Sequence, residues 1–288
     1  MNPMVTRMPA GLYLVATPIG SARDITLRAL DLLASCDVLV AEDTRSLRRL
    51  MEIHGVAPGG RPILSYHDHS GEAARARIMA DIAAGRSVLY ASEAGTPMIA
   101  DPGFDLVRAV RDAGHEVTSA PGPSAVITAL TLAGLPTDRF LFAGFLPSGA
   151  SQRKSALEAL AGVEATLVFY ESPKRVAAML RDASAVLGGQ REGALCRELT
   201  KKFEEVLRGT LEELAAICAE RTLKGEIVVV VGKGRAHATG EEDLREMLRA
   251  ALETMSVRDA ADAVAQATGA KRRSVYQLAL SLASEGLG

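Results

Sequence analysis

Four short segments of this sequence place acidic side chains beside proline, glycine or arginine, each directly after an apolar run. They cover residues 17–26, 42–49, 92–103 and 171–175. Glycine lets a backbone approach a ligand closely, and proline fixes the course of a loop. Carboxylates accept hydrogen bonds from hydroxyl and ammonium groups. One such segment alone fits a turn or a helix N-cap, but four of them favour a binding site for a small polar ligand.

The apolar runs before these segments predict β-strands, and amphipathic stretches between them predict helices. Strands are expected at 12–16, 38–41, 87–91, 116–120, 139–144, 165–170, 193–199 and 226–232. This alternation is typical of βαβ units and a mostly parallel sheet. Ligands of open α/β sheets bind beyond the carboxyl ends of the strands, which is where the four segments lie. No GxGxxG or GxxxxGK[ST] pattern occurs, so a dinucleotide or P-loop site is weakly supported.

Two breaks divide the chain into three parts. A Pro-Gly-Pro sequence at 121–123 predicts a seam between two α/β domains, and a polar, glycine-flanked stretch near 234–240 predicts a linker. Only helical patterns follow it. The expected fold class is α/β, with two α/β domains over 10–120 and 121–235. A small helix-turn-helix-like module is expected over 240–288.

Composition limits the classes of partner. The formal net charge is -2 and charged residues make up 24% of the chain, so nucleic-acid binding would need a local patch. The three cysteines, Cys36, Cys196 and Cys218, show no paired spacing, which argues against disulfides and zinc and fits a reducing cytosol. No apolar run approaches the roughly 20 residues that span a bilayer. We therefore predict a cytoplasmic protein without a membrane partner.

Seven ordered segments resemble a known family. They read LYLVATPIGSARDITLRAL, AEDTR, SEAGTPMIADPG, PGPSAVITALTLAGLPTDRFLFAGFLP, FYESPKR, RELTKKFEE and KGEIVVVV. Together they resemble the bacterial 16S rRNA (cytidine 2'-O)-methyltransferases, which are tetrapyrrole-methylase-like and depend on S-adenosylmethionine. The chain departs from the usual pattern at Ser21, Ser70, Glu93 and Lys174, where the family commonly has asparagine, asparagine, aspartate and histidine.

The resemblance implies a cofactor cleft between the two α/β domains, with S-adenosylmethionine as cofactor, a homodimer and no metal. The implied reaction is 2'-O-methylation of a cytidine ribose in the decoding region of 16S rRNA, with the 30S subunit as the expected substrate. Two alternatives stay open: a tetrapyrrole C-methyltransferase and a non-catalytic ribosome-assembly factor.

The segment YHDHS at 66–70 also suggests a metal site, because His and Asp are metal ligands, but it offers no third ligand nearby.

The resemblance also implies site residues. The expected cofactor-binding residues are Pro18, Ser92, Ala94, Gly95, Thr96, Ile99, Ser124, Ala125, Tyr170, Leu199, Gly225 and Ile227. Pro18 would lie near the point of methyl transfer. A ribose hydroxyl is a poor acid, so a base would help; Glu93 is the first candidate, followed by Asp24 and Glu42.

Clusters of basic residues predict contacts with RNA phosphates. The expected set is Arg45, Arg48, Arg49, Lys174, Arg175, Lys201, Lys271, Arg272 and Arg273, with Arg153, Lys154 and Lys202 as neighbours in such clusters. Lys271, Arg272 and Arg273 begin the second helix of a helix-turn-helix-like pattern. Basic runs on helices are as often merely solvated.

Overall fold

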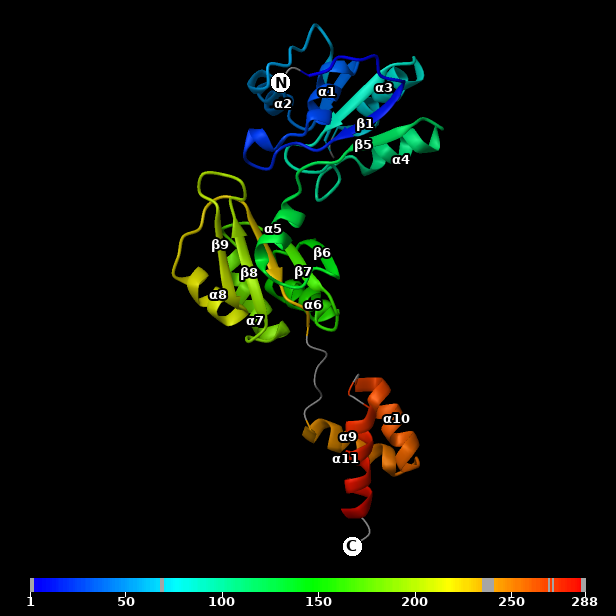
Figure 1. Cartoon of the computed structure of the whole chain (residues 1–288), viewed down its shortest axis with the longest axis vertical. Helices are drawn as coiled ribbons and strands as arrows, with labels where there is room; N and C mark the ends of the chain where they lie inside the picture. The colour runs from blue at the N-terminus through cyan, green and yellow to red at the C-terminus, as the bar shows by residue number, and fades with distance from the viewer. Residues whose placement is uncertain (1–2, 68–69, 235–240, 269, 271, 286–288) are drawn as a thin grey trace.

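The computed structural model describes residues 3–67, 70–234, 241–268, 270 and 272–285. It contains two α/β domains, each built on a five-stranded sheet, followed by a group of three helices (Figure 1). The predicted fold class is confirmed. Among the described residues, no helix combines the length and apolar character needed to cross a membrane.

The first sheet is wholly parallel, as expected. It contains β1 (Gly11–Val15), β2 (Val38–Ala41), β3 (Ile63–Ser65), β4 (Ser87–Ala91) and β5 (Val117–Ala120), in the order β3-β2-β4-β1-β5. The three central strands are buried throughout, which explains their continuous apolar sequences. The strand β3 was not predicted, because this edge strand has only three residues, none of them buried.

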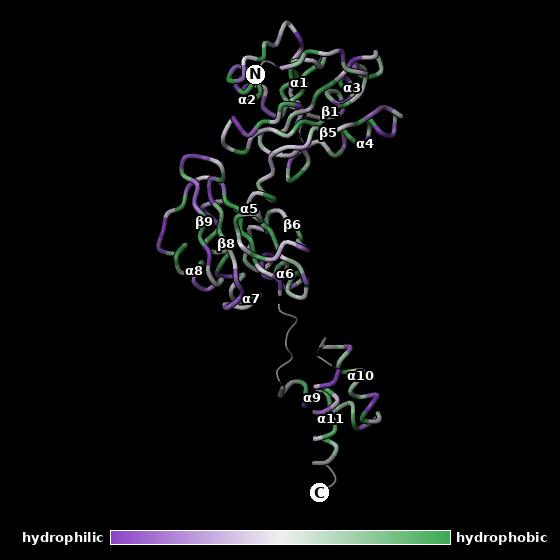
Figure 2. The backbone as a smooth tube through the Cα atoms, in the orientation of Figure 1, coloured by the Kyte–Doolittle hydropathy of each residue, from purple (hydrophilic) through white to green (hydrophobic). Residues whose placement is uncertain are grey.

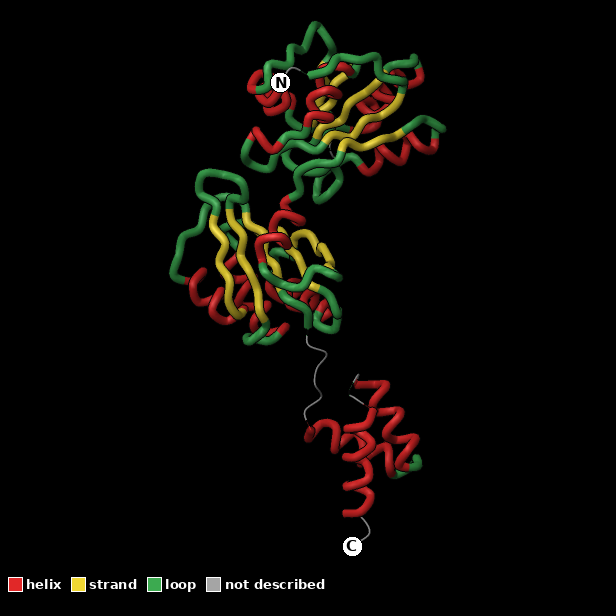
Figure 3. The backbone as a smooth tube through the Cα atoms, in the orientation of Figure 1, coloured by secondary structure: helices red, strands yellow, loops and turns green. Residues whose placement is uncertain are grey.

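Helices cover both faces of the first sheet (Figure 3). On one face α1 (Leu27–Ser35) and α2 (Thr44–Ile53) contribute to a core around Leu33, Leu39 and Met51. On the other face α3 (Gly71–Ala83) and α4 (Phe104–Asp112) contribute Ile78 and Leu106. A short 3-10 helix, η1 (Ala22–Asp24), follows β1.

The segment 42–49 was expected to be a loop, and most of it is helix α2. The Asp43 side chain accepts a hydrogen bond of 2.8 Å from the backbone N–H of Arg45 and so caps the first turn. Aspartate is among the strongest N-cap residues. Arg45, Arg48 and Arg49 therefore lie on a helix rather than in a loop.

The second sheet differs from the expectation. It contains β6 (Phe140–Phe145), β7 (Thr166–Glu171), β8 (Glu192–Arg197), β9 (Glu205–Thr210) and β10 (Ile227–Val231), in the order β6-β7-β10-β8-β9. Only β6 and β7 pair in parallel, so the prediction of a mostly parallel sheet is wrong here. The loop between β8 and β9 is too short for a parallel crossover, which takes about a dozen residues or more. Hydrophilic positions mark this loop (Figure 2).

The helices of the second domain also lie on both faces of their sheet. The chain leaves β5 and enters α5 (Ala125–Ala133), whose Val126 and Leu130 pack with Cys196 and Val228. The opposite face carries α6 (Ala150–Leu160), α7 (Val176–Leu187) and α8 (Leu211–Ala219). All three cysteines are buried and free.

A buried ion pair joins α6 to α7. Arg153 Nη2 lies 2.6 Å from Asp182 Oδ2, with both side chains under a tenth exposed, and Arg153 also donates to the carbonyl of Ser148 at 2.9 Å. The predicted place of Arg153 in a basic surface strip is therefore wrong. We expect Asp182→Ala to lower the free energy of unfolding by about 3–5 kcal/mol, because the guanidinium would stay buried without its counter-ion. Urea unfolding measures this, and a wild-type midpoint would contradict it.

A reciprocal pair of hydrogen bonds joins the start of β2 to the start of β4. Asp37 Oδ2 accepts from the backbone and hydroxyl of Ser87 at 2.9 and 2.7 Å, and Ser87 Oγ accepts from Asp37 N at 3.0 Å. The backbone N–H and hydroxyl of Ser87 hold the pKa of Asp37 below its usual value.

This lowered pKa makes part of the stability depend on pH. The stabilisation is fully present above the unfolded-state value of about 3.9 and is lost as the pH falls through the lower folded-state pKa. We expect Asp37→Asn to be less stable than wild type at pH 7, with a difference that shrinks toward pH 3. Urea unfolding across this range tests the effect, and a constant difference would contradict it.

The last three helices pack on one another. They are α9 (Glu241–Leu252), α10 (Val257–Thr268) and α11 (Arg272–Glu285), with Leu248, Val264 and Val275 in their common core. This agrees with the expected helical module. Lys271, expected at the start of the second helix of the helix-turn-helix-like pattern, lies outside the described residues.

Candidate active site

The loops that follow β1 and β4 are joined by backbone hydrogen bonds. Thr17 and Gly95 exchange N–H to carbonyl bonds of 2.9 Å in each direction. The Thr17 hydroxyl also donates to the carbonyls of Ser92 and Glu93, each at 3.2 Å. Gly95 has φ +82°, a left-handed conformation that glycine adopts without steric cost. The first and third predicted segments therefore form one unit.

Further contacts fix the course of the 92–103 loop. The Thr96 hydroxyl donates to the carbonyl of Pro123 at 2.9 Å, and the Tyr90 hydroxyl donates to that of Pro102 at 3.0 Å. Met98 and Ala100 have φ values of 68° and 61°. Non-glycine residues in this region are strained and concentrate at functional sites.

The first loop also docks on the second domain. Ile19 packs in the apolar cluster that contains Leu199, and Ser21 N donates to Thr200 Oγ1 at 3.0 Å. A Cβ added to Gly20 would lie 2.5 Å from Lys201 Cγ, so only glycine permits this close approach. Thr200 and its neighbour Glu198 also have positive φ, of 62° and 53°.

A cavity of about 460 Å³ lies between the two domains, at the ends of strands from both sheets. We call it the interdomain cavity. Its size falls within the roughly 300–1,000 Å³ typical of small-molecule sites. Half of the expected cofactor-binding residues line it: Ala94, Ile99, Ala125, Tyr170, Leu199 and Ile227.

The other expected cofactor residues lie close by in the chain. Gly95 and Thr96 follow Ala94 in the same loop, and Ser124 is the N-cap residue of α5. Gly225 packs against the Glu198 side chain. Pro18 and Ser92 line a different cavity, described below.

Sequence reasoning missed several residues of this lining. Phe145 and Val228 contribute to it, and neither has an unusual local pattern. Ile19 also lines it and belongs to the first segment, 17–26, while Glu226 lies between the expected residues Gly225 and Ile227. Glu171, Ser172 and Pro173 also line it, and they belong to the fourth segment that the sequence analysis singled out.

Tyr170 presents an aromatic ring to the interdomain cavity. Its ring meets Phe142 and Phe145 edge-on, with centroids 4.8 and 5.6 Å away. Burial raises the pKa of Tyr170 to about 12, and the charges of Asp101 and Glu226 add to the effect. The hydroxyl therefore stays protonated at neutral pH, and the ring offers a neutral surface against which a flat base can pack.

Two of the predicted basic residues already bind acids beside this cavity. Arg175 lies 3.2 Å from the buried carboxylate of Glu171. Lys201 bridges Glu198 and Glu226 at 3.0 and 2.7 Å. Both cations therefore help to hold the cavity wall in place.

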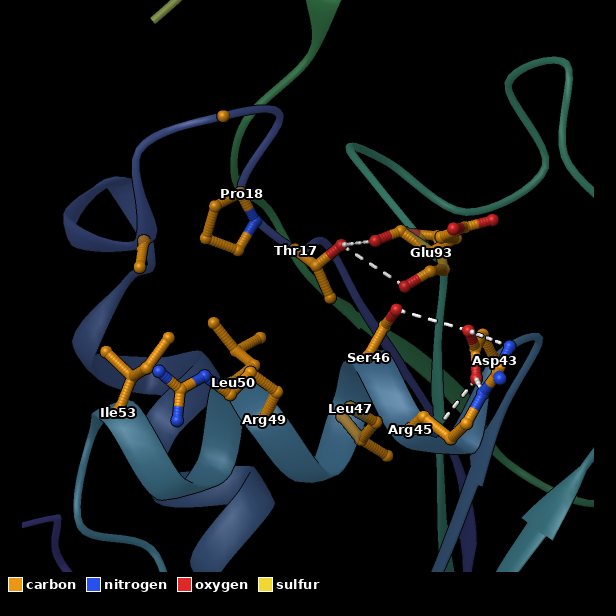
Figure 4. Close-up of a pocket in the computed structure, with 13 residues that line it drawn as sticks. Thr17, Pro18, Asp43, Arg45, Ser46, Leu47, Arg49, Leu50, Ile53 and Glu93 are labelled. Atoms are coloured by element: carbon orange, nitrogen blue, oxygen red, sulfur yellow. Dashed lines mark hydrogen bonds and ion pairs between the residues drawn. The ribbon is translucent and has the colours of Figure 1, made fainter. Parts of the chain in front are cut away.

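A second cavity, of about 560 Å³, lies between the first loop and α2 (Figure 4). We call it the α2 cavity. Pro18 faces Leu50 and Ile53 across it, while Arg45 and Arg49 line it from the same helix. Glu93 lines both cavities, so the two spaces adjoin there.

The structure separates the three candidate bases. Glu93 borders both cavities, whereas Asp24 lies exposed in η1 and Glu42 follows β2; neither lines the cavities described here. Asp43 lines the α2 cavity, but the N–H of Arg45 lowers its pKa and the hydroxyl of Ser46 donates to it at 3.3 Å. Its carboxylate thus serves to cap α2.

The remaining predicted RNA contacts vary in setting. Arg48 and Lys174 are exposed. In the helical module Arg273 is exposed, while Arg272 forms an ion pair with Asp262. No cluster of three or more His, Cys, Asp or Glu side chains that could hold a metal was found among the described residues. Asp68 and His69 of the YHDHS segment lie outside them.

Comparisons with known proteins agree with this architecture. The tetrapyrrole (corrin/porphyrin) methylase family matches residues 11–215, and the RsmI C-terminal HTH domain matches 238–283. Uroporphyrin-III C-methyl transferase from Thermus thermophilus, solved with S-adenyl homocysteine, has a TM-score of 0.54 at 20% identity. The match covers 77% of this chain and 97% of that one, and it shows the shared fold.

Curated relatives are much closer in sequence. "Ribosomal RNA small subunit methyltransferase I" of Mesorhizobium japonicum is 46% identical over 96% of this chain and 95% of its own length. The Xylella fastidiosa protein of that name is 42% identical over 93% of this chain and 98% of its own length. The predicted family, the predicted enzyme class and S-adenosylmethionine as cofactor agree with these matches. The chain therefore belongs to the tetrapyrrole methylases and, within them, to the ribosomal RNA small subunit methyltransferase I family.

Proposed function

We propose that this protein transfers a methyl group from S-adenosylmethionine to the ribose 2'-hydroxyl of a cytidine in the decoding region of 16S rRNA, within the 30S subunit. The observation that carries the proposal is that the interdomain cavity and the arginine-lined α2 cavity share Glu93 in their linings. A donor site and a site for a polyanionic acceptor are thus adjacent. The identity of the nucleotide rests on the family resemblance.

The lining of the interdomain cavity fits S-adenosylmethionine chemically. Tyr170 and Leu199 offer apolar surfaces for a purine, and the loop at Ala94 to Thr96 offers backbone groups for an amino-acid moiety. Carboxylates from Glu93, Asp101 and Glu226 around the cavity suit a cofactor that carries a sulfonium and an ammonium. When bound, the cofactor supplies an electrophilic methyl group.

The residues of the chain have two tasks in this reaction. The two loops joined at Thr17 and Gly95 hold the acceptor hydroxyl in line with the methyl group of the cofactor. Alignment of this kind lowers the activation barrier by up to roughly 7–11 kcal/mol in favourable systems. Glu93 accepts the proton of the ribose hydroxyl, because it is the only one of the three predicted bases that borders both cavities. Pro18 limits how the acceptor ribose can turn.

We further propose that the helical module docks on RNA through Arg273 and its neighbours.

We expect a cytoplasmic homodimer with domains at 10–120, 121–235 and 240–288. Phe140 and Leu141, which are exposed on the edge strand β6, suit a contact between two copies. Light scattering would test the dimer.

The test is methyl transfer from labelled S-adenosylmethionine to 30S subunits that lack the modification. Naked 16S rRNA and a tetrapyrrole precursor serve as parallel substrates, and mass spectrometry identifies the product nucleoside. We expect 2'-O-methylcytidine from 30S subunits. Methylation of the macrocycle alone would move the protein to a tetrapyrrole C-methyltransferase. Cofactor binding without any transfer would support an assembly factor instead.

A further inference from the structure

We propose that the α2 cavity is the site for the acceptor nucleotide, which it takes as a single nucleotide unpaired from the RNA. The ribose would lie at the Glu93 end, and the flanking phosphates would lie at Arg45 and Arg49. This assignment rests on the proposed function and adds where, and by which side chains, the RNA is held.

The α2 cavity and the interdomain cavity adjoin at Glu93. Methyl transfer requires the reacting atoms to approach within about 3–3.5 Å, so the acceptor must occupy space that opens onto the donor site. Pro18 and Ser92 line the α2 cavity, and their near neighbours Ile19 and Ala94 line the interdomain cavity. The same two chain segments thus form the border of both spaces, with Glu93 common to them.

One face of α2 combines two cationic side chains with an apolar one. Arg45, Arg49 and Ile53 recur every four residues and therefore share a face of the helix, which is the face that lines the cavity. Ile53 is 51% exposed although it is a large apolar residue. With Leu50 on the same helix and Pro18 across the cavity, it forms an apolar surface beside the cations (Figure 4). A nucleotide has this combination of an apolar base face and anionic phosphates.

Both arginines are available to phosphate. Arg45 pairs with Asp43, and its side chain is 90% exposed. Arg49 pairs with Glu52, with both side chains about two-thirds exposed. Exposed ion pairs of this kind contribute only about 0–1 kcal/mol, so phosphate can replace the carboxylates. Two guanidiniums one helical turn apart suit the two phosphates that flank one nucleotide.

Access to this cavity requires an unpaired nucleotide. A ribose in a base-paired duplex is flanked by stacked neighbours, and enzymes that act inside such stacks usually extrude the target into a pocket. We infer that the target nucleotide is already single-stranded or is turned out on binding.

The test uses the full chain with undermethylated 30S subunits. The double variant Arg45→Gln/Arg49→Gln should raise KM about tenfold or more. Each lost phosphate contact to single-stranded RNA reduces the slope of log affinity against log salt concentration by about 0.7 in magnitude. The slope of the double variant should therefore be smaller by about 1.4 than that of wild type. Ile53→Asp should also raise KM, because it places a charge in the cavity. Calorimetry should show unchanged S-adenosylmethionine binding by all variants, which also verifies that they are folded.

Arg108 provides the matched control. It is an exposed arginine on α4, is ion-paired with Asp112 and does not line the α2 cavity. Arg108→Gln should leave KM and the salt slope unchanged. If wild type methylates the RNA and the Arg45→Gln/Arg49→Gln variant has the same kinetics, the nucleotide site is wrong and the proposed function stands. No RNA methylation by wild type would overturn the proposed function, and the nucleotide site with it.

Discussion

An enzyme with Glu93→Gln should bind S-adenosylmethionine normally and methylate 30S subunits about 10²–10⁴-fold more slowly. This range is the usual contribution of a positioned general base. Glutamine keeps the shape of the side chain but cannot accept the proton of the ribose hydroxyl. Because the Glu93 carbonyl, not its carboxylate, accepts the hydrogen bond from Thr17, the loop should keep its course. Single-turnover rates and cofactor calorimetry provide the two measurements.

Two further variants make this result specific. Glu93→Asp should recover much of the rate, since a carboxylate remains at the border of the two cavities. Asp112→Asn, an exposed acid on α4, should have wild-type turnover. If Glu93→Gln also turned over at the wild-type rate, Glu93 would be a loop-stabilising residue and no base.

The second large effect is expected at Gly95. The variant Gly95→Val should lose measurable S-adenosylmethionine binding in the calorimeter. At φ +82° a side chain costs roughly 1–2 kcal/mol, and the new Cβ would lie 3.3 Å from Ile19 Cγ2. We expect the loop to relieve the backbone strain by leaving its bridge to Thr17, which would move the wall of the interdomain cavity.

A control variant at Gly114 distinguishes the effect of backbone strain from the effect of losing the cofactor site. It has φ +76° with open space around its Cβ position, and it follows α4 rather than lining either cavity. Gly114→Val should therefore cost similar stability but leave cofactor binding intact. Equal cofactor affinity in Gly95→Val and wild type would remove the 92–103 loop from the cofactor site.

The sequence predicted the elements better than their pairing. Continuous apolar runs such as 87–91 were sufficient to identify buried strands, and the first sheet followed from the βαβ pattern. The strand β9 has the sequence EVLRGT and is only half-buried, so its polar positions concealed it. The place of β10 between β7 and β8 depends on contacts between residues 30 or more positions apart, which local patterns do not encode.

The candidate site was predicted in part for the same reason. Acidic and glycine-containing loops at strand ends could be found locally, and the family resemblance supplied Tyr170 and Leu199. Local patterns could not reveal that Lys201 is held between Glu198 and Glu226, or that Gly20 touches the second domain. The Lys201 bridge joins residues up to 25 positions apart within the second domain, and the Gly20 contact exists only where the two domains meet.

The four described non-glycine residues with positive φ, Met98, Ala100, Glu198 and Thr200, all belong to the loops around the interdomain cavity. Each costs of order 1–3 kcal/mol relative to a relaxed backbone. The folded chain is thus destabilised by backbone strain in the loops where the cofactor is expected to bind. Directed evolution for heat resistance alone would be rewarded for introducing glycine at these positions. The selected variants would have a higher melting temperature, but their loops would lose their fixed conformation. Selection for thermal stability and selection for methyl transfer would therefore favour different residues at these four positions.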